Sequence, residues 1–469
     1  MNPLANLLDW ETVEQALVET LKNHPLKHNL QILVAGEPII LVRNWYGQLM
    51  LLLPCARSEL DRSVCMPIVS DLRLPVGSLA LPTWVMCRDE LFGADSYWSD
   101  RSLLPLVSVS DDAKPDQPIQ LLCLLERQER DRDWLSPAPN GGGASRKTKR
   151  CVFFSIKGGV GRSSALTMLA IELARRGKRV LVVDGDFESP GLSSSLLPRD
   201  DGQPAYGVVD WLTAQALGAD VETLQRMALT QVVEHSPLNS RLALQGQLLV
   251  APAYGQKTQA YVAKLARLYR QSPDGKVYAQ RLNEFLTMLE AQHDIDVTLF
   301  DSRAGIDETS AAAVTQLKAD ASFLFAINTS QTWDAYGLLF KHLGRNPLLL
   351  QASPDTDNGE WNLRESLHLV SALTPQEAGA YVGYFEQLQE NAYDTFREIY
   401  DEDAGDDSNA FAPAPDDENA PHSAVKVMWN DALRAFNPLG QPDLLNDPMV
   451  HAAFSDFLNK ATVLLGVTE

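Results

Sequence analysis

The sequence lacks any long apolar run and any paired cysteine motif. No stretch approaches 18 consecutive apolar residues, so no transmembrane helix or membrane anchor is expected. The first residues show no basic segment followed by an apolar one, so no secretory signal is expected. The five cysteines are scattered, with no C-x-x-C pair. Such a set fits reduced thiols in a cytoplasmic protein and argues against a zinc site or a disulfide framework.

Positive charge is also scarce. The chain has 40 Lys and Arg residues against 61 Asp and Glu residues, which gives a formal net charge of −21. Nonspecific nucleic-acid binding and docking on anionic lipid both depend on clustered basic residues, so neither is expected. The acidic balance indicates either solubility alone or a basic protein partner, and both interpretations stay open.

The first 135 residues predict a separate α+β domain. At 469 residues, the chain is long enough for two or three domains. Asp9 can cap a helix that runs to about Leu21, and short β-type runs separated by turns follow, which suggests a meander. No catalytic constellation is found in this part, so a regulatory or partner-binding module is expected. The β-type runs are 30–35, 39–42 and 49–53.

Residues 136–150 predict a flexible linker, because proline, glycine and serine dominate their first ten positions. The last five positions are mostly basic. They could form a patch for a partner or a solvated entry to the first strand of the next domain. The basic residues are Arg146, Lys147, Lys149 and Arg150.

From residue 151 onward, strand and helix patterns alternate. This alternation predicts an α/β fold, with a mostly parallel sheet flanked by helices over 151–469. A mostly helical insertion is expected over 205–290. The C-terminal third is expected to be helical, with one late strand at 424–429. Strands are also expected at 151–154, 179–183, 248–252, 297–300 and 322–327.

An acidic segment interrupts the C-terminal third. Between Asp401 and Glu418 lie eight acidic residues and no basic one, together with proline, glycine, serine and asparagine. This composition predicts a mobile acidic loop over 401–419. The loop could be a solvated spacer or a segment that docks on a partner.

Residues 151–164 are the most informative stretch, because a β-type run leads into a glycine-rich turn and then a helix pattern. Gly158, Gly159 and Gly161 let backbone N–H groups converge on a phosphate, and the helix N-terminus adds positive charge. Ser163 offers a hydroxyl that can reach Mg²⁺. Arg162 stands where such a loop normally carries lysine. The pattern predicts a nucleotide-binding loop.

Two acidic segments follow at later strand ends. Asp184 and Asp186 come after the strand at 179–183, and Asp301 comes after the strand at 297–300. Carboxylates at that edge of a parallel sheet face the bound ligand. One can orient a water molecule, and the others can support Mg²⁺. These residues are therefore expected to complete a site for ATP and Mg²⁺.

The run Lys157-Gly158-Gly159-Val160-Gly161-Arg162-Ser163-Ser164 resembles the deviant Walker A loop of the ParA/MinD group of P-loop ATPases. Asp184 and Asp186 resemble its first switch motif, and residues 301–305 resemble its second. The similarity covers about 151–345 well and 346–469 loosely. Residues 1–135 lie outside it.

The resemblance implies a role for each matching residue. Lys157 would reach across an ATP-sandwiched dimer to the partner's phosphates, Asp186 would orient the attacking water, and Arg162 would act on the phosphates. Asn328 would be a candidate contact of the base, or else a strand-end turn residue. Mg²⁺ would be supported by Ser163, Asp184, Asp186 and Asp301, and the nucleotide would be held by Gly158, Gly159, Val160, Gly161, Arg162, Ser163 and Ser164.

The function expected from these features is a cytoplasmic ATP-dependent homodimerisation switch with slow, Mg²⁺-dependent hydrolysis that acts on a protein partner. Arg162 keeps the positive charge of the usual lysine, but its planar fork is wider than an ammonium group. A nucleotide-binding sensor or scaffold without useful turnover is therefore an alternative. A DNA-partitioning ATPase is a second alternative, disfavoured by the net charge. An accessory role in phage defence or plasmid maintenance is compatible with this expectation.

Overall fold

The described part of the chain forms two compact units, Met1–Pro137 and Ala138–Glu469. In this computed structural model, no described helix combines the length and the apolar composition that crossing a membrane requires. The described residues are 10–44, 47–100, 103–111, 114–126, 132–136, 146–198, 202–233, 242–269, 272–274, 276–350, 353–355, 359–401, 410–434 and 436–467.

The N-terminal unit contains a five-stranded mixed sheet, in the order β3-β2-β1-β5-β4. β1 pairs antiparallel with β2 but parallel with β5, and β2 pairs parallel with β3. The expected meander is therefore wrong, because parallel neighbours require longer connections than a meander has. The strands are β1 (Ile39–Arg43), β2 (Leu49–Leu53), β3 (Ala80–Cys87), β4 (Leu104–Asp111) and β5 (Lys114–Glu126).

Short helices accompany this sheet and confirm the α+β class of the unit. The β-type run expected at 30–35 is wrong, because most of it belongs to α2 (Lys27–Val34). Leu30 and Val34 are both buried, and their spacing of four residues places them on one face of a helix. The other helices of the unit are α1 (Trp10–Asn23), α3 (Arg57–Arg62), α4 (Met66–Asp71), α5 (Asp95–Trp98) and α6 (Arg132–Leu135).

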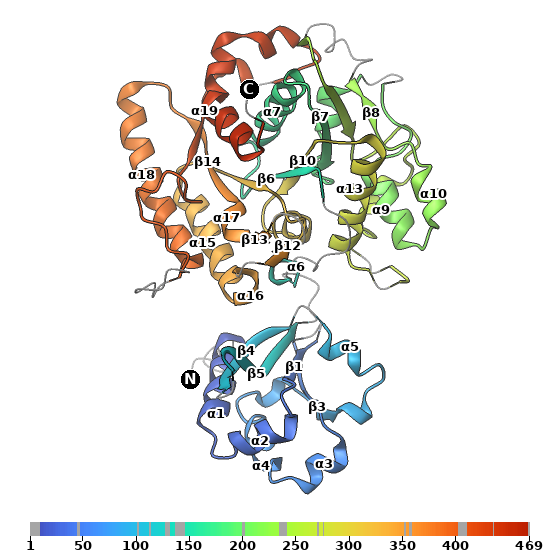
Figure 1. Ribbon diagram of the computed structural model, residues 1–469, viewed down its shortest axis with the longest axis vertical. Helices are drawn as coiled ribbons and strands as arrows, with labels where there is room; N and C mark the ends of the chain where they lie inside the picture. The colour runs from blue at the N-terminus through green and yellow to red at the C-terminus, as the bar shows by residue number, and fades with distance from the viewer. Residues whose placement is uncertain are drawn as a thin grey trace, which may run out of the picture. The chain divides into compact units, whose positions relative to one another are not determined.

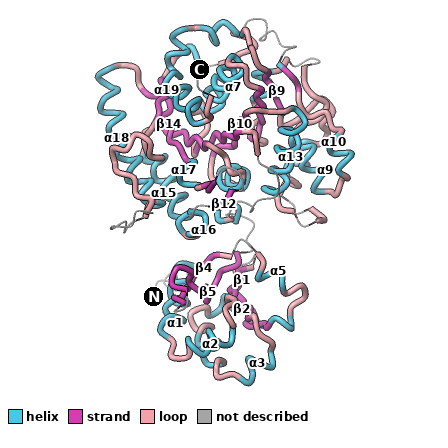
Figure 2. The backbone as a smooth tube through the Cα atoms, in the orientation of Figure 1, coloured by secondary structure: helices cyan, strands magenta, loops and turns pink. Residues whose placement is uncertain are grey.

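The second unit is built on an eight-stranded sheet in the order β15-β14-β11-β6-β10-β7-β9-β8. Neighbouring strands are parallel except for the edge strand β8, which runs antiparallel to β9. Figure 2 shows these strands in the middle of the unit, with helices around them. The expected mostly parallel sheet is confirmed. Its strands are β6 (Lys149–Ser155), β7 (Arg179–Gly185), β8 (Gln231–Val232), β9 (Gln247–Ala251), β10 (Val297–Ala304), β11 (Ala321–Ala326), β14 (Leu367–Thr374) and β15 (Val425–Met428).

Helices cover both faces of the sheet, and β6 shows why. Successive side chains of a strand point to opposite faces. Phe153 packs against Phe457 of α19 (Pro448–Leu464), while its neighbour Phe154 packs against Tyr336 of α15 (Ser330–Gly344). In Figure 1, α7 (Arg162–Arg175) and α19 lie together on one side, with α13 (Tyr278–His293) and α15 on the other.

Further elements surround this core. The stretch expected to be a mostly helical insertion, 205–290, holds α9, α10, α12 and α13, and it also supplies the edge strand β8 and its neighbour β9. Residues 402–409 of the predicted acidic loop lie outside the described residues, and 410–419 form neither helix nor strand. The remaining elements are α8 (Leu192–Leu196), α9 (Val208–Ala216), α10 (Val221–Gln225), α12 (Tyr261–Leu265), α14 (Glu308–Ala311), α16 (Pro347–Leu350), α17 (Leu363–Ser366), α18 (Ala378–Phe396), β12 (Ser353–Asp355) and β13 (Gly359–Trp361).

β14 was missed by the sequence analysis, which expected helix and one late strand in the C-terminal third. β14 lies between β11 and β15, so it belongs to the interior of the sheet. Its apolar run is interrupted by His368 and Ser371, and both are buried. Burial lowers the pKa of His368 to about 4, so the ring is neutral near pH 7 and can sit in the core.

The basic end of the predicted linker is part of the second unit. Arg146 donates to Asp320 and to the carbonyls of Leu317 and Lys318. Arg150 lies in β6 and is buried, where it forms a two-pronged ion pair with Glu290 at 2.7 Å. The two interpretations of this basic stretch, a partner patch and a solvated entry to the strand, are therefore wrong for Arg146 and Arg150. Both side chains form ion pairs within the second unit.

We predict that the buried pair is needed for stability. Replacing Arg150 with methionine should lower the free energy of unfolding by about 3–5 kcal/mol, because the Glu290 carboxylate would remain buried without its cation. Lys149→Met is the matched control on the same strand. Its side chain is 41% exposed and forms an ion pair with Asp320. The control should cost about 1 kcal/mol or less. Chemical denaturation measures both losses, and equal losses would contradict the account.

Candidate nucleotide-binding site

A glycine loop (residues 156–161) joins the carboxyl end of β6 to the start of α7. Gly159 and Gly161 have φ angles of +75° and +82°, which side chains other than glycine rarely adopt. A Cβ placed on Gly158 or Gly159 would meet no atom within 4 Å, so this part of the loop borders open space. Val160 is buried in the core and holds the loop down. α7 begins directly after this loop, and open space beside a helix N-terminus suits an anion.

Arg162 does not point into that space but is folded back beneath the loop. Its side chain is buried, and its Nε donates to Asp301 Oδ1 at 2.6 Å. The other two nitrogens donate to Ser155 Oγ at 3.0 Å and to Asp186 Oδ2 at 3.3 Å. The guanidinium thus joins the start of α7 to Asp301 on β10 and to Asp186 just beyond β7.

The second oxygen of Asp301 is also occupied. Ser163 Oγ donates to Asp301 Oδ2 at 2.7 Å, from the first turn of α7. Asp301 is almost completely buried near the end of β10, so its charge depends on these two partners. Ser163 and Asp301 were expected at one site, and the structure places them in contact. The contact of Arg162 with the same carboxylate was not expected.

Asp184 was expected to support a metal, but in the structure its carboxylate binds the backbone of the segment that follows it. Its carboxylate accepts backbone N–H groups of Asp186, Gly191 and Leu192 at 3.2–3.3 Å. Burial, with the nearby charge of Asp301, raises the pKa of Asp184 well above its usual range. Asp184 therefore shapes the first switch segment (residues 184–191) and is not an open ligand.

Asp186 lies nearer to the loop and is partly exposed. Besides Arg162, it accepts the backbone N–H of Ser189 at 3.3 Å. Burial raises the pKa of Asp186, and the Arg162 charge opposes that rise. This carboxylate can therefore face a bound ligand.

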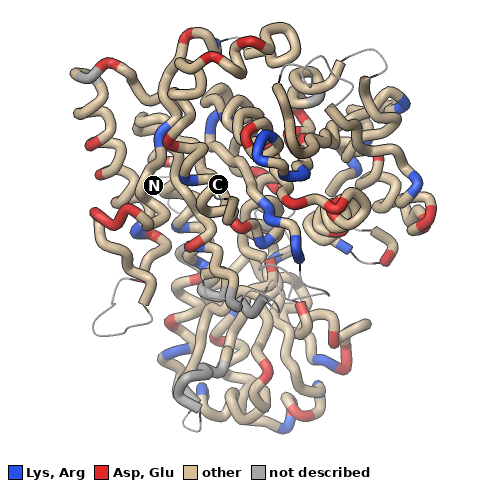
Figure 3. The backbone as a smooth tube through the Cα atoms, turned by 45° about the horizontal axis from the view of Figure 1, so that its top comes forward, with Lys and Arg blue, Asp and Glu red and all other residues tan. Residues whose placement is uncertain are grey.

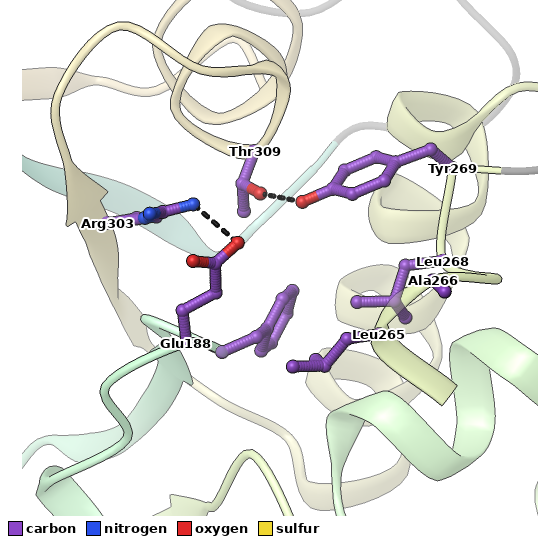
Figure 4. Close-up of a pocket in the computed structure, with 8 residues that line it drawn as sticks. Glu188, Leu265, Ala266, Leu268, Tyr269, Arg303 and Thr309 are labelled. Carbon is purple, nitrogen blue, oxygen red and sulfur yellow. Dashed lines mark hydrogen bonds and ion pairs between the residues drawn. The ribbon is translucent and has the colours of Figure 1, made fainter. Parts of the chain in front are cut away.

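The first switch segment is linked to the second switch segment (residues 301–305). Arg303 and Glu188 form an ion pair at 2.6 Å beside a pocket of about 230 Å³ (Figure 4). Tyr269 and Thr309 also line this pocket, and their hydroxyls are 2.6 Å apart. Glu188 and Arg303 were missed, although both fall within the acidic motifs, because nothing in the sequence shows that they pair.

Lys157 and Asn328 lie at the border of the site. The Lys157 amine is 3.3 Å from the hydroxyl of Thr329, at the start of α15. The Asn328 amide oxygen accepts from Trp333 and Asn391, at 2.8 and 3.0 Å. Asn328 follows β11, and its side chain links α15 to α18, which agrees with the alternative of a strand-end turn residue. These hydrogen bonds leave the side chain little freedom to bind a base.

The site fits a phosphate better than it fits a metal. The open glycine loop and the α7 N-terminus provide donors for phosphate oxygens. Ser163 and Asp301 carry the oxygen ligands that Mg²⁺ prefers, but Arg162 occupies Asp301 and Asp186. Within the described ranges, no group of three or more His, Cys, Asp or Glu residues is arranged to hold a metal. Mg²⁺ held by these carboxylates would require the guanidinium to leave.

Solved structures similar to this chain include three with TM-scores between 0.38 and 0.40. A ParA family ATPase from Chlorobium tepidum is 16% identical, covers 67% of this chain and 98% of its own, and has a TM-score of 0.40. MinD in the Aquifex aeolicus MinC:MinD complex is 16% identical, with coverages of 69% and 98% and a TM-score of 0.38. The pNOB8 ParA bound to nonspecific DNA is 15% identical, with coverages of 68% and 99% and a TM-score of 0.39.

The sequence comparison is more decisive. No curated protein matches the chain. The family model of the CobQ/CobB/MinD/ParA nucleotide binding domain matches residues 151–391, just over half of the chain. This match begins in β6 and includes the glycine loop and both switch segments. The chain therefore belongs to the CobQ/CobB/MinD/ParA nucleotide-binding family.

Proposed function

We propose that this protein is an ATP-dependent dimerisation switch with slow hydrolysis. One observation carries the proposal: the glycine loop borders open space at the start of α7, at the sheet edge that also carries the two switch segments. In parallel α/β sheets, ligands bind outside the carboxyl ends of the strands, where this loop lies. The family's nucleotide-binding character supports ATP as the ligand.

The loop would hold the phosphates mainly through its backbone. The N–H groups around Gly158, Gly159 and Gly161 and the positive end of α7 supply the donors. The Ser163 and Ser164 side chains stand in the first turn of that helix. Asn328 is not included among the proposed contacts of the base, because its amide is already bonded.

The switching element would be the pair of switch segments. Arg162 binds Asp186 of the first, and Arg303 of the second binds Glu188 of the first. A phosphate group arriving in front of the loop adds negative charge close to Arg162, and that charge competes with Asp186 for the guanidinium. A shift of the first segment would pass through the Glu188 ion pair to the second segment.

Dimerisation is assigned to Lys157 of the glycine loop, and partner binding is assigned to surfaces outside the loop. Lys157 is the residue proposed to reach the phosphates of a second copy. The N-terminal unit and the acidic 401–419 segment are proposed to address a protein partner with a basic surface. Acidic and basic residues are interspersed along the described backbone (Figure 3), and the net charge of −21 opposes a nucleic-acid partner.

Slow turnover follows from the position of Arg162. Phosphoryl transfer requires little more than positioning and stabilisation of charge. The guanidinium is already bonded to Asp301, so less of its charge is available to a transferring phosphoryl group. The same contact favours the second candidate, a nucleotide sensor without useful turnover.

We predict that Gly158→Val abolishes ATP binding and leaves the fold intact. The φ of Gly158 lies outside the left-handed range, and its Cβ would meet nothing, so valine fits the loop but fills the phosphate space. The affinity measured by calorimetry should fall at least about a hundredfold, or roughly 2.7 kcal/mol. Gly337→Val in α15, also in open surroundings, is the control. Unchanged affinity in Gly158→Val would refute the site.

We predict that Lys157→Ala binds ATP but dimerises poorly. Loss of one member of an interfacial charge pair costs roughly 2 kcal/mol or more, so dimerisation should weaken at least about thirtyfold. Light scattering with a non-hydrolysable ATP analogue measures this effect. Lys341→Ala, an exposed lysine at the other end of α15, serves as the control. Normal dimerisation of Lys157→Ala would make Lys157 an ordinary surface residue.

We predict that Asp186→Ala binds ATP but releases phosphate at least about a hundredfold more slowly than the wild type, because a positioned base contributes about 10²–10⁴-fold. A phosphate-release assay on both proteins tests this, with calorimetry to show that binding is retained. Equal rates in the two proteins would favour the sensor and remove the claim of enzymatic turnover.

A further inference from the structure

We infer that the Arg162 guanidinium takes the place of a divalent cation in this site, so that nucleotide binding does not depend on Mg²⁺. The inference rests on the proposed function only in that a nucleotide must bind the glycine loop. Ser163, Asp301 and Asp186 were expected to support Mg²⁺. In the structure, Asp301 and Asp186 instead accept hydrogen bonds from Arg162, and Asp301 also accepts one from Ser163.

The negative charges of two carboxylates must be balanced in this site. Asp301 is buried and the Asp186 side chain is 17% exposed, so water solvates both carboxylates poorly. Arg162 reaches both, at 2.6 and 3.3 Å. Among the described residues, no other Lys or Arg forms an ion pair with either carboxylate. The guanidinium is therefore the cation that stabilises this pair of acids.

The carboxylate oxygens that could bind a metal here already accept hydrogen bonds. Asp301 Oδ1 accepts from Arg162 and Oδ2 accepts from Ser163, so both oxygens are used. Asp184 faces the same cluster, but backbone N–H groups hold both of its oxygens. Mg²⁺ requires a nearly octahedral set of oxygens and keeps several waters. The described side chains offer it few free oxygens, and a fixed guanidinium at this distance repels a dication.

The shape of the arginine side chain also suits the position of a cation in this site. A guanidinium presents N–H groups in a planar fork, which here meets Asp301, Asp186 and Ser155 in three directions. A lysine ammonium is a compact point charge and cannot match this fork. A lysine at position 162 would hold the carboxylates less firmly and leave them accessible to a metal.

The first experiment uses the full-length wild-type protein and ADP, which avoids turnover. ADP affinity is measured by calorimetry in saturating Mg²⁺ and again in EDTA. We expect the two affinities to agree within about threefold, or roughly 0.7 kcal/mol. A loss of about tenfold or more in EDTA would overturn the inference. An absence of binding in both conditions would instead refute the proposed nucleotide site.

The second experiment compares Arg162→Lys with Arg176→Lys, whose arginine forms an ion pair with Glu172 near the end of the same helix. Arg162→Lys should become at least about tenfold dependent on Mg²⁺ for ADP binding, whereas Arg176→Lys should behave like the wild type. Mn²⁺ provides a direct probe, because electron paramagnetic resonance counts bound ions. The ADP complex of the wild type should hold no Mn²⁺ and that of Arg162→Lys should hold one.

Two results would contradict the role of the guanidinium. One is stoichiometric Mn²⁺ in the wild-type ADP complex. The other is an Arg162→Lys protein that is folded by circular dichroism and as independent of Mg²⁺ as the wild type. If Arg162→Lys does not fold, the comparison of wild-type protein in Mg²⁺ and EDTA still decides the question.

Discussion

The ion pair between Arg162 and Asp301 is the interaction on which the organisation of this site depends. It joins the first turn of α7 to the end of β10, and the same guanidinium reaches Asp186 beyond β7. Because both carboxylates are poorly solvated, they require a cation at this point. Arg162 supplies it from within the chain, so the loop and both switch segments are organised around one side chain.

The fold makes this meeting possible. β10 lies between β6 and β7 in the sheet, and all three strands are parallel, so their carboxyl ends lie at one edge. The glycine loop and the two switch segments follow those three ends. A second layer of contact, between Glu188 and Arg303, then ties the switch segments to each other. A change at the loop can therefore reach both segments through two ion pairs.

The sequence predicted the loop, the strand-end acids and the mostly parallel sheet, because each depends on local patterns of glycine, apolar runs and charge. It did not predict the partners of Arg162, since these come from strands far apart in the chain. β14 was missed because His368 and Ser371 break its apolar pattern, although burial accommodates both. The basic residues at 146–150 were interpreted as solvated or partner-binding because their acids, Asp320 and Glu290, lie at a distance in sequence.

The position of Arg162 in a nucleotide complex tests this account most directly. Crystals of the full-length protein with ADP and Mn²⁺ would show the guanidinium, and anomalous scattering would locate any metal. The account predicts that Arg162 remains on Asp301, with no manganese peak beside Ser163. A guanidinium turned onto the phosphates, with manganese bound between Ser163 and Asp301, would contradict it.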